Sequence, residues 1–329
     1  MNNNYMTESN FWKYQPILPV KNQKPYTTIG NIPPFIGTNT YDTELHIYRF
    51  HMKYFDDILN FINDNYIRGY RLLPDYLRRK LTIVNSYSYV LCDNQCIVGF
   101  IYSQPLLSTN QHLAPAHYVD LMTILRSHRK KGYAAILISA ITNFSGNSRV
   151  FIHKKDEKPL MFPYFYRSRH YSASISLLID KYQSTFRTNS NKSVINTQRA
   201  YQIYELECGT LKYKNPIDIF HTSSSVKTHI FRDCAVVSFA IFEFGRNTTI
   251  AEIFYVSLEF NNDDYIQLIH ILHQLDIQLI VSLPYRFFKL CIEKDSYMES
   301  MELFIHSYNM YIPEQTENGI DAIIPFIAF

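Results

Sequence analysis

One stretch, residues 118–141, constrains the fold more than any other part of the chain. Its first half is an apolar run of the length of a buried strand. Its second half, from Tyr133, has apolar residues on most turns of a helix. Between the halves lies the basic turn Arg129-Lys130-Lys131-Gly132-Tyr133-Ala134. The stretch therefore predicts a buried strand, a basic turn and a helix, in that order.

The basic turn predicts an anion-binding site. Backbone N–H groups at a helix N-terminus, a glycine that admits close backbone approach and flanking cations all favour a bound diphosphate. An R-x-x-G-x-A turn between a strand and a helix resembles the pyrophosphate-binding turn of the GNAT superfamily, which holds acyl-coenzyme A. An ordinary solvated loop after a buried strand is the other interpretation of this short pattern.

Composition limits the class of protein. The chain of 329 residues is 47% hydrophobic and 16% aromatic, which is enough for one large domain or two of ordinary size. A net charge of +3 gives no support to nucleic-acid binding or to a polybasic membrane anchor. Five cysteines, an odd number, argue against a disulfide framework, and no apolar run is long enough to span a bilayer. We therefore expect a cytoplasmic protein without stable membrane insertion.

The first part of the chain has a consistent order of predicted elements around the basic turn. The expected strands and helices are a strand at 44–50, helices at 53–67 and 74–81, a hairpin of strands at 87–92 and 97–104, and a strand at 149–153. This order, with the central strand, turn and helix inserted before the last strand, is the order that the GNAT resemblance requires.

The second part of the chain repeats this order approximately. Residues 183–192 are polar and rich in Ser, Asn and Thr, so we expect a domain boundary near residue 190, between domains 1–190 and 191–329. The expected elements are a strand at 202–207, a hairpin at 235–244 and 249–260, a helix at 263–275 and a strand at 279–282. No glycine-rich basic turn occurs there, so the second domain is expected to bind an acceptor instead of a coenzyme.

Several short motifs follow one another along nearly the whole chain. They are FWKYQPI at 11–17, VGF at 98–100, the basic turn, KP at 158–159, YFYRS at 164–168 and NTQR at 196–199. Taken in this order they resemble eukaryotic glycylpeptide N-myristoyltransferase, a family built from two GNAT-like halves. The chain looks like a shortened, diverged member, of the kind expected from a large DNA virus or a protist. It departs from the family in two places: the glycine-rich K-F-G-x-G-D-G loop is absent, and Asp120 stands where Asn is usual.

The resemblance implies a fold and an activity. The fold is α/β with a mixed sheet, in which two tandem GNAT-like halves form one pseudo-symmetric, saddle-shaped body. The activity is transfer of a myristoyl group from myristoyl-CoA, a co-substrate, to the N-terminal glycine amine of protein substrates. Domain 1–190 would bind the acyl-CoA, and domain 191–329 would bind the peptide and carry the C-terminal carboxylate. The resemblance also implies a monomer, in the host cytoplasm if the source is viral, with no permanently bound cofactor and no metal.

The resemblance assigns the catalytic groups to the main chain. In the family the general base is the C-terminal carboxylate, which here belongs to Phe329. The chain ends IIPFIAF, apolar to its last residue, which predicts a buried terminus, although a last strand with a surface carboxylate fits the pattern too. By position, the oxyanion donors fall on the N–H groups of Leu121 and Met122.

The remaining site residues are also assigned by the resemblance. Arg129, Lys130 and Lys131, with the amides of Gly132, Tyr133 and Ala134, would hold the coenzyme phosphates. The nucleotide end of the coenzyme would lie against Trp12, and the candidate peptide contacts are Tyr164, Tyr166 and Asn196. Two other functions stay open, a GNAT acyltransferase that uses acetyl-CoA and a different amine, and a catalytically silent protein that binds acyl chains or peptides.

Overall fold

The computed structural model describes most of the chain, in these ranges: 15, 29–35, 45–66, 69–108, 115–147, 150–156, 164–182, 194–207, 211–213, 220, 222–245, 247–284 and 299–309. The chain divides into two compact units. The first unit comprises Met1–Tyr166 and Phe304–Thr316, and the second comprises Arg167–Leu303 and Glu317–Phe329. The domain boundary predicted near residue 190 lies outside the described residues.

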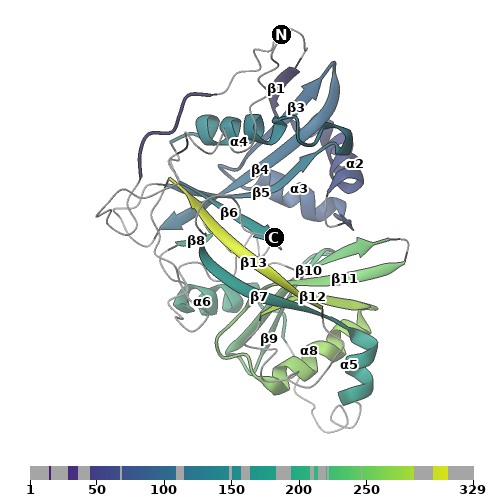
Figure 1. The fold of residues 1–329 in the computed structure, drawn as a ribbon. Coiled ribbons are helices and arrows are strands. Elements are labelled where there is room, and N and C mark those ends of the chain that lie inside the picture. Colours follow the sequence, from purple (N-terminus) through teal and green to yellow (C-terminus); the bar gives the residue numbers. More distant parts are fainter. Residues whose placement is uncertain are drawn as a thin grey trace. The chain divides into compact units, whose positions relative to one another are not determined.

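The first unit is built on a mixed sheet (Figure 1). Its strands, in spatial order, are β1 (Leu45–Arg49), β3 (Tyr87–Asp93), β4 (Cys96–Ser108), β5 (Ala116–Ile124) and β6 (Val150–Asp156), followed by β13 (Glu299–Tyr308), which belongs to this unit from Phe304 onward. The first three pairings are antiparallel, whereas β5 and β6 run parallel. The predicted fold class, α/β with a mixed sheet, is therefore confirmed.

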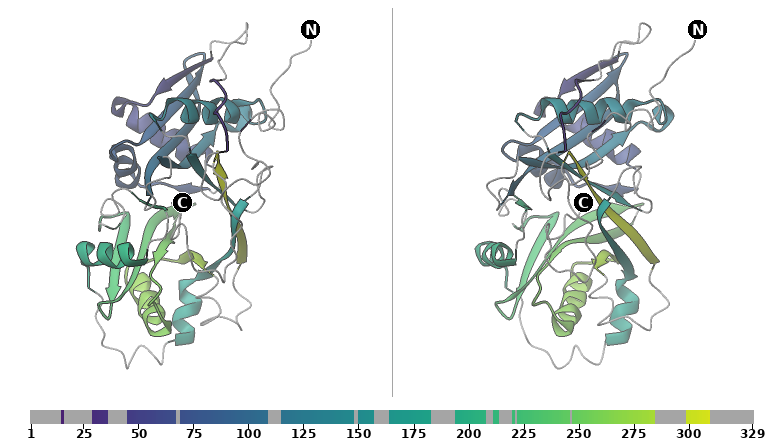
Figure 2. Two further views of the ribbon diagram at one scale, coloured as in Figure 1. Left: turned by 90° about the vertical axis from the view of Figure 1, so that its left-hand side faces the viewer. Right: turned by 60° about the vertical axis from the view of Figure 1, so that its left-hand side comes forward.

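Helices cover both faces of this sheet (Figure 2). The helix α4 (Tyr133–Phe144) packs on β3 and β4, where Gly99 admits it closely, because a Cβ atom at Gly99 would lie 2.9 Å from the Leu137 side chain. On the opposite face α3 (Pro74–Thr82) is fixed by the Tyr102 hydroxyl, which donates to a backbone carbonyl of that helix at 2.8 Å. The helical segments on this unit, besides α4, are η1 (Met52–Tyr54), α2 (Phe55–Asn65), α3 (Pro74–Thr82) and η2 (Arg126–His128).

The local sequence explains where these helices begin. The helix α2 carries Asp56 and Asp57 in its first turn, where acidic side chains offset the positive end of the helix dipole. In α3, Pro74 occupies the start, where the missing N–H of proline costs nothing. The helix α4 has neither feature, which matters for the site below.

The second unit contains a similar mixed sheet. Its strands are β7 (Tyr164–Ser174), which belongs to this unit from Arg167 onward, β9 (Val226–Phe231), β10 (Ala235–Phe244), β11 (Thr248–Val256) and β12 (Leu279–Pro284). The pairs β9/β10, β10/β11 and β12/β7 are antiparallel, and β11/β12 is parallel. Two helices, α5 (Ile175–Tyr182) and α8 (Asn262–Gln274), pack against each other and share one apolar core with the strands (Figure 1). The described elements also include β2 (Tyr70–Arg71) and β8 (Leu211–Tyr213).

One predicted strand is wrong. Residues 202–207 belong to the helix α6 (Thr197–Glu207). The side chain of Asn196 begins this helix by accepting the N–H of Arg199 at 3.0 Å, and Ile203 and Tyr204 are buried. Residues 202–207 by themselves are too few to show a helical period, and the cap that starts the helix lies upstream of them.

The two units share one succession of elements. A hairpin strand, a second strand, a helix and a parallel strand appear as β4–β5–α4–β6 in the first unit and as β10–β11–α8–β12 in the second. In each unit the pairing of the first two strands is interrupted by a register shift, between Phe100 and Tyr102 on β4 and between Ser238 and Phe239 on β10. The turns that precede the two helices can therefore be compared directly.

Candidate functional site

The turn between β5 and α4 leaves the N-terminus of the helix open. Lys130 and Gly132 both have positive φ, 66° and 84°, and Gly132 stands at the N-cap. The first N–H groups of an α-helix have no partner inside it. Here no side chain caps them, and the first turn contains no acidic residue. The arrangement suits an external anion.

The three cations of the turn have different environments. Lys130 and Lys131 are exposed, whereas Arg129 is half-buried. The Arg129 guanidinium donates to the carbonyl of Asn65 at 2.7 Å and to that of Ile124 at 3.3 Å. Arg129 therefore ties the turn to the end of α2, and the two lysines are the cations that the fold leaves at the surface.

The Tyr133 side chain, at the first position of α4, points towards the β3–β4 hairpin. Its hydroxyl donates to Asp93 at 3.0 Å, and the His128 ring lies 3.7 Å from the same carboxylate. Tyr133 can thus offer its backbone N–H, but not its hydroxyl, to a ligand at the turn. Asp93 was not among the predicted site residues, and its place at the end of a hairpin strand was the only signal in the sequence.

A bulge on β5 carries the two predicted oxyanion donors. Phe100 pairs with Thr123 and Tyr102 pairs with Asp120, so both Leu121 and Met122 lie opposite one residue of β4. Leu121 is buried and has a left-handed backbone, with φ of 53°. Its N–H donates to the Asp120 carboxylate at 2.7 Å. A substrate oxygen at the bulge would share the Leu121 N–H with that carboxylate and would have the Met122 N–H as its second donor.

The strands β5 and β6 separate beside this bulge. They pair over residues 116–119 and 150–153, and both strands continue beyond the last pair, Val119 with His153. The bulge therefore lies where the two parallel strands part. His153 is buried there, its Nε2 has no hydrogen-bond partner among the described residues, and burial together with His306 lowers its pKa to about 3. The imidazole is therefore neutral at physiological pH.

A buried ion pair lies under the bulge. The Lys80 ammonium group, from α3, is 2.5 Å from the Asp120 carboxylate, and the two side chains are 10% and 3% exposed. Sequence reasoning missed Lys80, although Tyr76, Leu77 and Lys80 recur at a helical spacing that places the lysine on the buried face of α3.

The other predicted site residues are placed only in part. Trp12 and Phe329 lie outside the described residues, and Tyr164 and Tyr166 lie on β7. Asn196 caps α6 in the second unit. Among the described residues, no group of three or more His, Cys, Asp or Glu side chains is arranged to hold a metal ion, and no helix is long and apolar enough to cross a membrane.

Comparison with solved structures identifies the fold. The structure of Saccharomyces cerevisiae N-myristoyltransferase with bound myristoyl-CoA matches with a TM-score of 0.72 and 10% identity, over 97% of this chain and 99% of that one. The chain has the N-myristoyltransferase fold. A second structure of the yeast enzyme with myristoyl-CoA matches with a TM-score of 0.70 and 11% identity, over 100% of this chain and 97% of that one. No protein-family model and no curated protein matches the sequence.

A GNAT structure extends the likeness. The GCN5-related glucosamine N-acetyltransferase region of a fungal multi-domain β-N-acetylglucosaminidase matches with a TM-score of 0.50 and 12% identity, over 85% of this chain and 39% of that one. The predicted likeness in fold to N-myristoyltransferase is thus confirmed across almost the whole chain. At these identities the likeness concerns the fold, and the chemistry has to be argued from the residues of this chain.

Proposed function

We propose that the protein transfers a fatty acyl group, myristoyl in the first place, from its coenzyme A thioester to the N-terminal glycine amine of a protein. One observation carries this proposal: the uncapped N-terminus of α4, flanked by Lys130 and Lys131, directly follows a bulged strand within an N-myristoyltransferase fold. An anion site and a main-chain bulge on consecutive segments suit a ligand that has a diphosphate at one end and a reactive carbonyl at the other.

The amides of α4 would hold the coenzyme diphosphate. The N–H groups of Tyr133 and Ala134 belong to the open first turn, and the two exposed lysines add positive charge. Arg129 would act indirectly, because its bonds to the carbonyls of Asn65 and Ile124 fix the path of the turn. Trp12 would pack against the nucleotide end.

The reaction would take place beside the bulge of β5. The glycine amine attacks the thioester carbon, the carbonyl oxygen becomes an oxyanion, and the C–S bond then breaks to release the thiol of coenzyme A. Main-chain N–H groups of Leu121 and Met122 would stabilise the oxyanion. An N-terminal amine has a pKa of about 8 and is mostly protonated at neutral pH, so a base must remove a proton before the attack. We assign this role to the C-terminal carboxylate of Phe329.

The acceptor peptide would bind mainly to residues 191–329, and the acyl-CoA to residues 1–190. Tyr164, Tyr166 and Asn196 are the proposed peptide contacts. The side-chain oxygen of Asn196 caps α6, so this residue would contribute its NH2 group. We further propose that the protein acts as a monomer in the cytoplasm, without a permanently bound cofactor.

The proposal is tested by incubating the purified protein with myristoyl-CoA and two peptides that differ only in an N-terminal Gly or Ala. Mass spectrometry should show acylation of the Gly peptide alone. A parallel reaction with acetyl-CoA separates the alternatives, since efficient acetyl transfer would indicate a short-chain GNAT enzyme. Binding of myristoyl-CoA without transfer to either peptide would indicate a silent relative. A protein that does not bind myristoyl-CoA and transfers no acyl group would refute the proposal.

The role of the C-terminus is tested separately. Deletion of Phe329, or addition of one residue after it, should abolish transfer without weakening the binding of myristoyl-CoA, because the carboxylate would be displaced from the amine. Activity that survives either change would show that another group removes the proton.

A further inference from the structure

The Lys80–Asp120 ion pair stands out because both of its charged side chains are buried in the first unit. Removing two charges from water costs several kcal/mol per ion, and a well-packed apolar pair is often as stable as a buried ion pair. Stability alone therefore gives little reason for a lysine and an aspartate at these positions. A role for their charges or hydrogen bonds elsewhere in the fold has to be considered.

The two oxygen atoms of Asp120 have different partners. One oxygen faces the Lys80 ammonium group, and the other accepts the N–H of Leu121 at 2.7 Å. On the other side of Leu121, the Thr123 hydroxyl donates to the Leu121 carbonyl at 3.1 Å. Side chains therefore bind both the N–H and the carbonyl of Leu121, whose left-handed backbone is strained because it is not a glycine.

Lys80 is itself fixed in place. The Tyr102 hydroxyl donates to the Lys80 carbonyl at 2.8 Å and lies 3.2 Å from the Gln104 side-chain oxygen. The ammonium group lies 5.4 Å from the centre of the Tyr76 ring and 5.6 Å from that of Tyr102, within the range of cation–π attraction. Lys80 thus serves as a rigid support for the Asp120 carboxylate, unlike an exposed lysine with many rotamers.

We infer that Lys80 and Asp120 are positioning residues for acyl transfer: Asp120 holds the left-handed bulge of β5 through the Leu121 N–H, and Lys80 neutralises the carboxylate beside the developing oxyanion. The inference rests on the proposed function, because it concerns the main-chain donors of that reaction. Asp120 has to be an acceptor to hold the bulge, and an acceptor with a full negative charge would repel the oxyanion unless a cation faced it.

The two parts of this role can be separated by double variants that carry no net charge at the pair. Lys80→Met with Asp120→Asn keeps an acceptor oxygen for the Leu121 N–H, whereas Lys80→Met with Asp120→Ala removes it. We expect the Met/Asn variant to have a kcat within about threefold of the wild type, and the Met/Ala variant a kcat lower by about a hundredfold. The KM for myristoyl-CoA should change by less than about threefold in both, because the coenzyme phosphates are bound elsewhere.

The single variant Lys80→Met leaves an unneutralised carboxylate at the bulge. It should lower kcat by at least about tenfold, and adding Asp120→Asn should restore it. The neutral double variants keep the test valid if the single variant does not fold. A matched control removes an ion pair of the second unit, with Arg232→Met and Asp264→Asn. This change should alter stability but not the kcat of the folded protein.

The outcomes distinguish the inference from the proposed function. If the wild-type protein transfers no acyl group under any condition, the proposed function fails and the inference fails with it. If the wild type is active and the Met/Asn and Met/Ala variants have the same kcat, the inference alone is wrong and the pair only supports the fold. A large kcat difference at similar KM and similar melting temperature supports the positioning role.

Discussion

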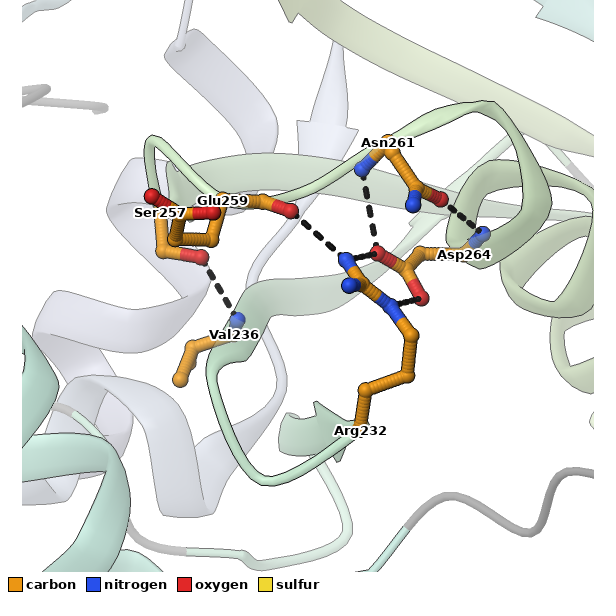
Figure 3. Close-up of polar contacts among 6 residues, drawn as sticks. All are labelled: Arg232, Val236, Ser257, Glu259, Asn261 and Asp264. Atoms are coloured by element: carbon orange, nitrogen blue, oxygen red, sulfur yellow. Dashed lines mark hydrogen bonds and ion pairs between the residues drawn. The ribbon is translucent and has the colours of Figure 1, made fainter.

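The two units contain the same strand–turn–helix arrangement, but the helices begin in opposite ways. In the first unit, α4 begins at Gly132 with no side-chain cap and no acidic residue in its first turn. In the second unit, α8 begins at Asn261 in a capping box, where Asn261 accepts the N–H of Asp264 at 3.1 Å and Asp264 accepts the N–H of Asn261 at 3.0 Å. The Asp264 carboxylate also binds the Arg232 guanidinium, with contacts of 2.6 and 3.0 Å (Figure 3).

The difference shows that the turn, and not the fold, decides whether the helix begins open or capped. At α8 the positive end of the helix already has an anion, supplied by the chain itself and neutralised by Arg232, which also donates to the Glu259 carbonyl at 2.7 Å (Figure 3). At α4 the corresponding place has a glycine and two exposed lysines.

The largest expected effect concerns the closed turn. Replacing Asp264 with Ala removes the capping box and leaves Arg232 without its carboxylate, so the free energy of unfolding should fall by about 3 kcal/mol. Asp263→Ala, at an exposed neighbour in the same first turn, is the matched control and should cost less than about 0.5 kcal/mol. Urea denaturation measures both, and equal losses would show that the network in Figure 3 does not stabilise the second unit.

The next effect concerns the open turn. Reversing both exposed charges, with Lys130→Glu and Lys131→Glu, should weaken the binding of coenzyme A by about thirtyfold, because the variant places carboxylates next to the diphosphate. Lys53→Glu with Arg71→Glu, two exposed cations elsewhere in the unit, reproduces the change in net charge. Isothermal titration should show near-normal affinity for this control. Equal weakening in both variants would mean that only the overall charge matters.

Sequence reasoning found the elements of the first unit because each has a strong local signal. The apolar strand, the glycine turn and the apolar helix α4 lie where the periodicity placed them. It failed at α6, where a helix starts at a cap that lies upstream of the run that was read as a strand. The pattern of local periodicity carries no information on which residue ends one element and starts the next.

Parts of the candidate site could not be predicted because they depend on contacts between distant segments. The Arg129 guanidinium binds the carbonyl of Asn65, 64 positions away, and no local pattern contains this contact. Lys80 and Asp120 lie 40 positions apart, and no local pattern in either segment predicts that they pair. Asp120 was recognised only as a departure from a family pattern, and its bond to the Leu121 N–H required the coordinates.

Buried histidines extend the comparison between the units to pH. Burial lowers the pKa of His153 in the first unit to about 3 and that of His229 in the second to about 4, from 6.5 in the unfolded chain. At a pH between the folded-state pKa and 6.5, the unfolded state binds more protons than the folded state. The stabilising effect is therefore complete at neutral pH and is lost as the pH drops below 6.5. Each histidine should cost about 2 kcal/mol at about pH 5.

The variants His153→Met and His229→Met test this. Each variant should take up about one proton fewer on unfolding at about pH 5 than the wild type does. The slope of the unfolding free energy against pH measures this number. The variant His270→Met, at an exposed histidine on α8, supplies the control for removing an imidazole from the surface. A slope that is the same in all three variants would show that the buried rings are protonated in the folded protein.

The smallest expected effect is the most direct test of the comparison, because it gives the open helix an acid of the kind that the closed helix has. Ala134 occupies the second position of α4, as Asp263 does in α8. Ala134→Asp should stabilise the fold by about 0.5 kcal/mol through the helix dipole and should weaken coenzyme A binding by about tenfold through repulsion. Ala134→Asn, of the same shape without the charge, should change both quantities much less. Stability and affinity that move in the same direction would contradict the view that the open end of α4 is reserved for an external anion.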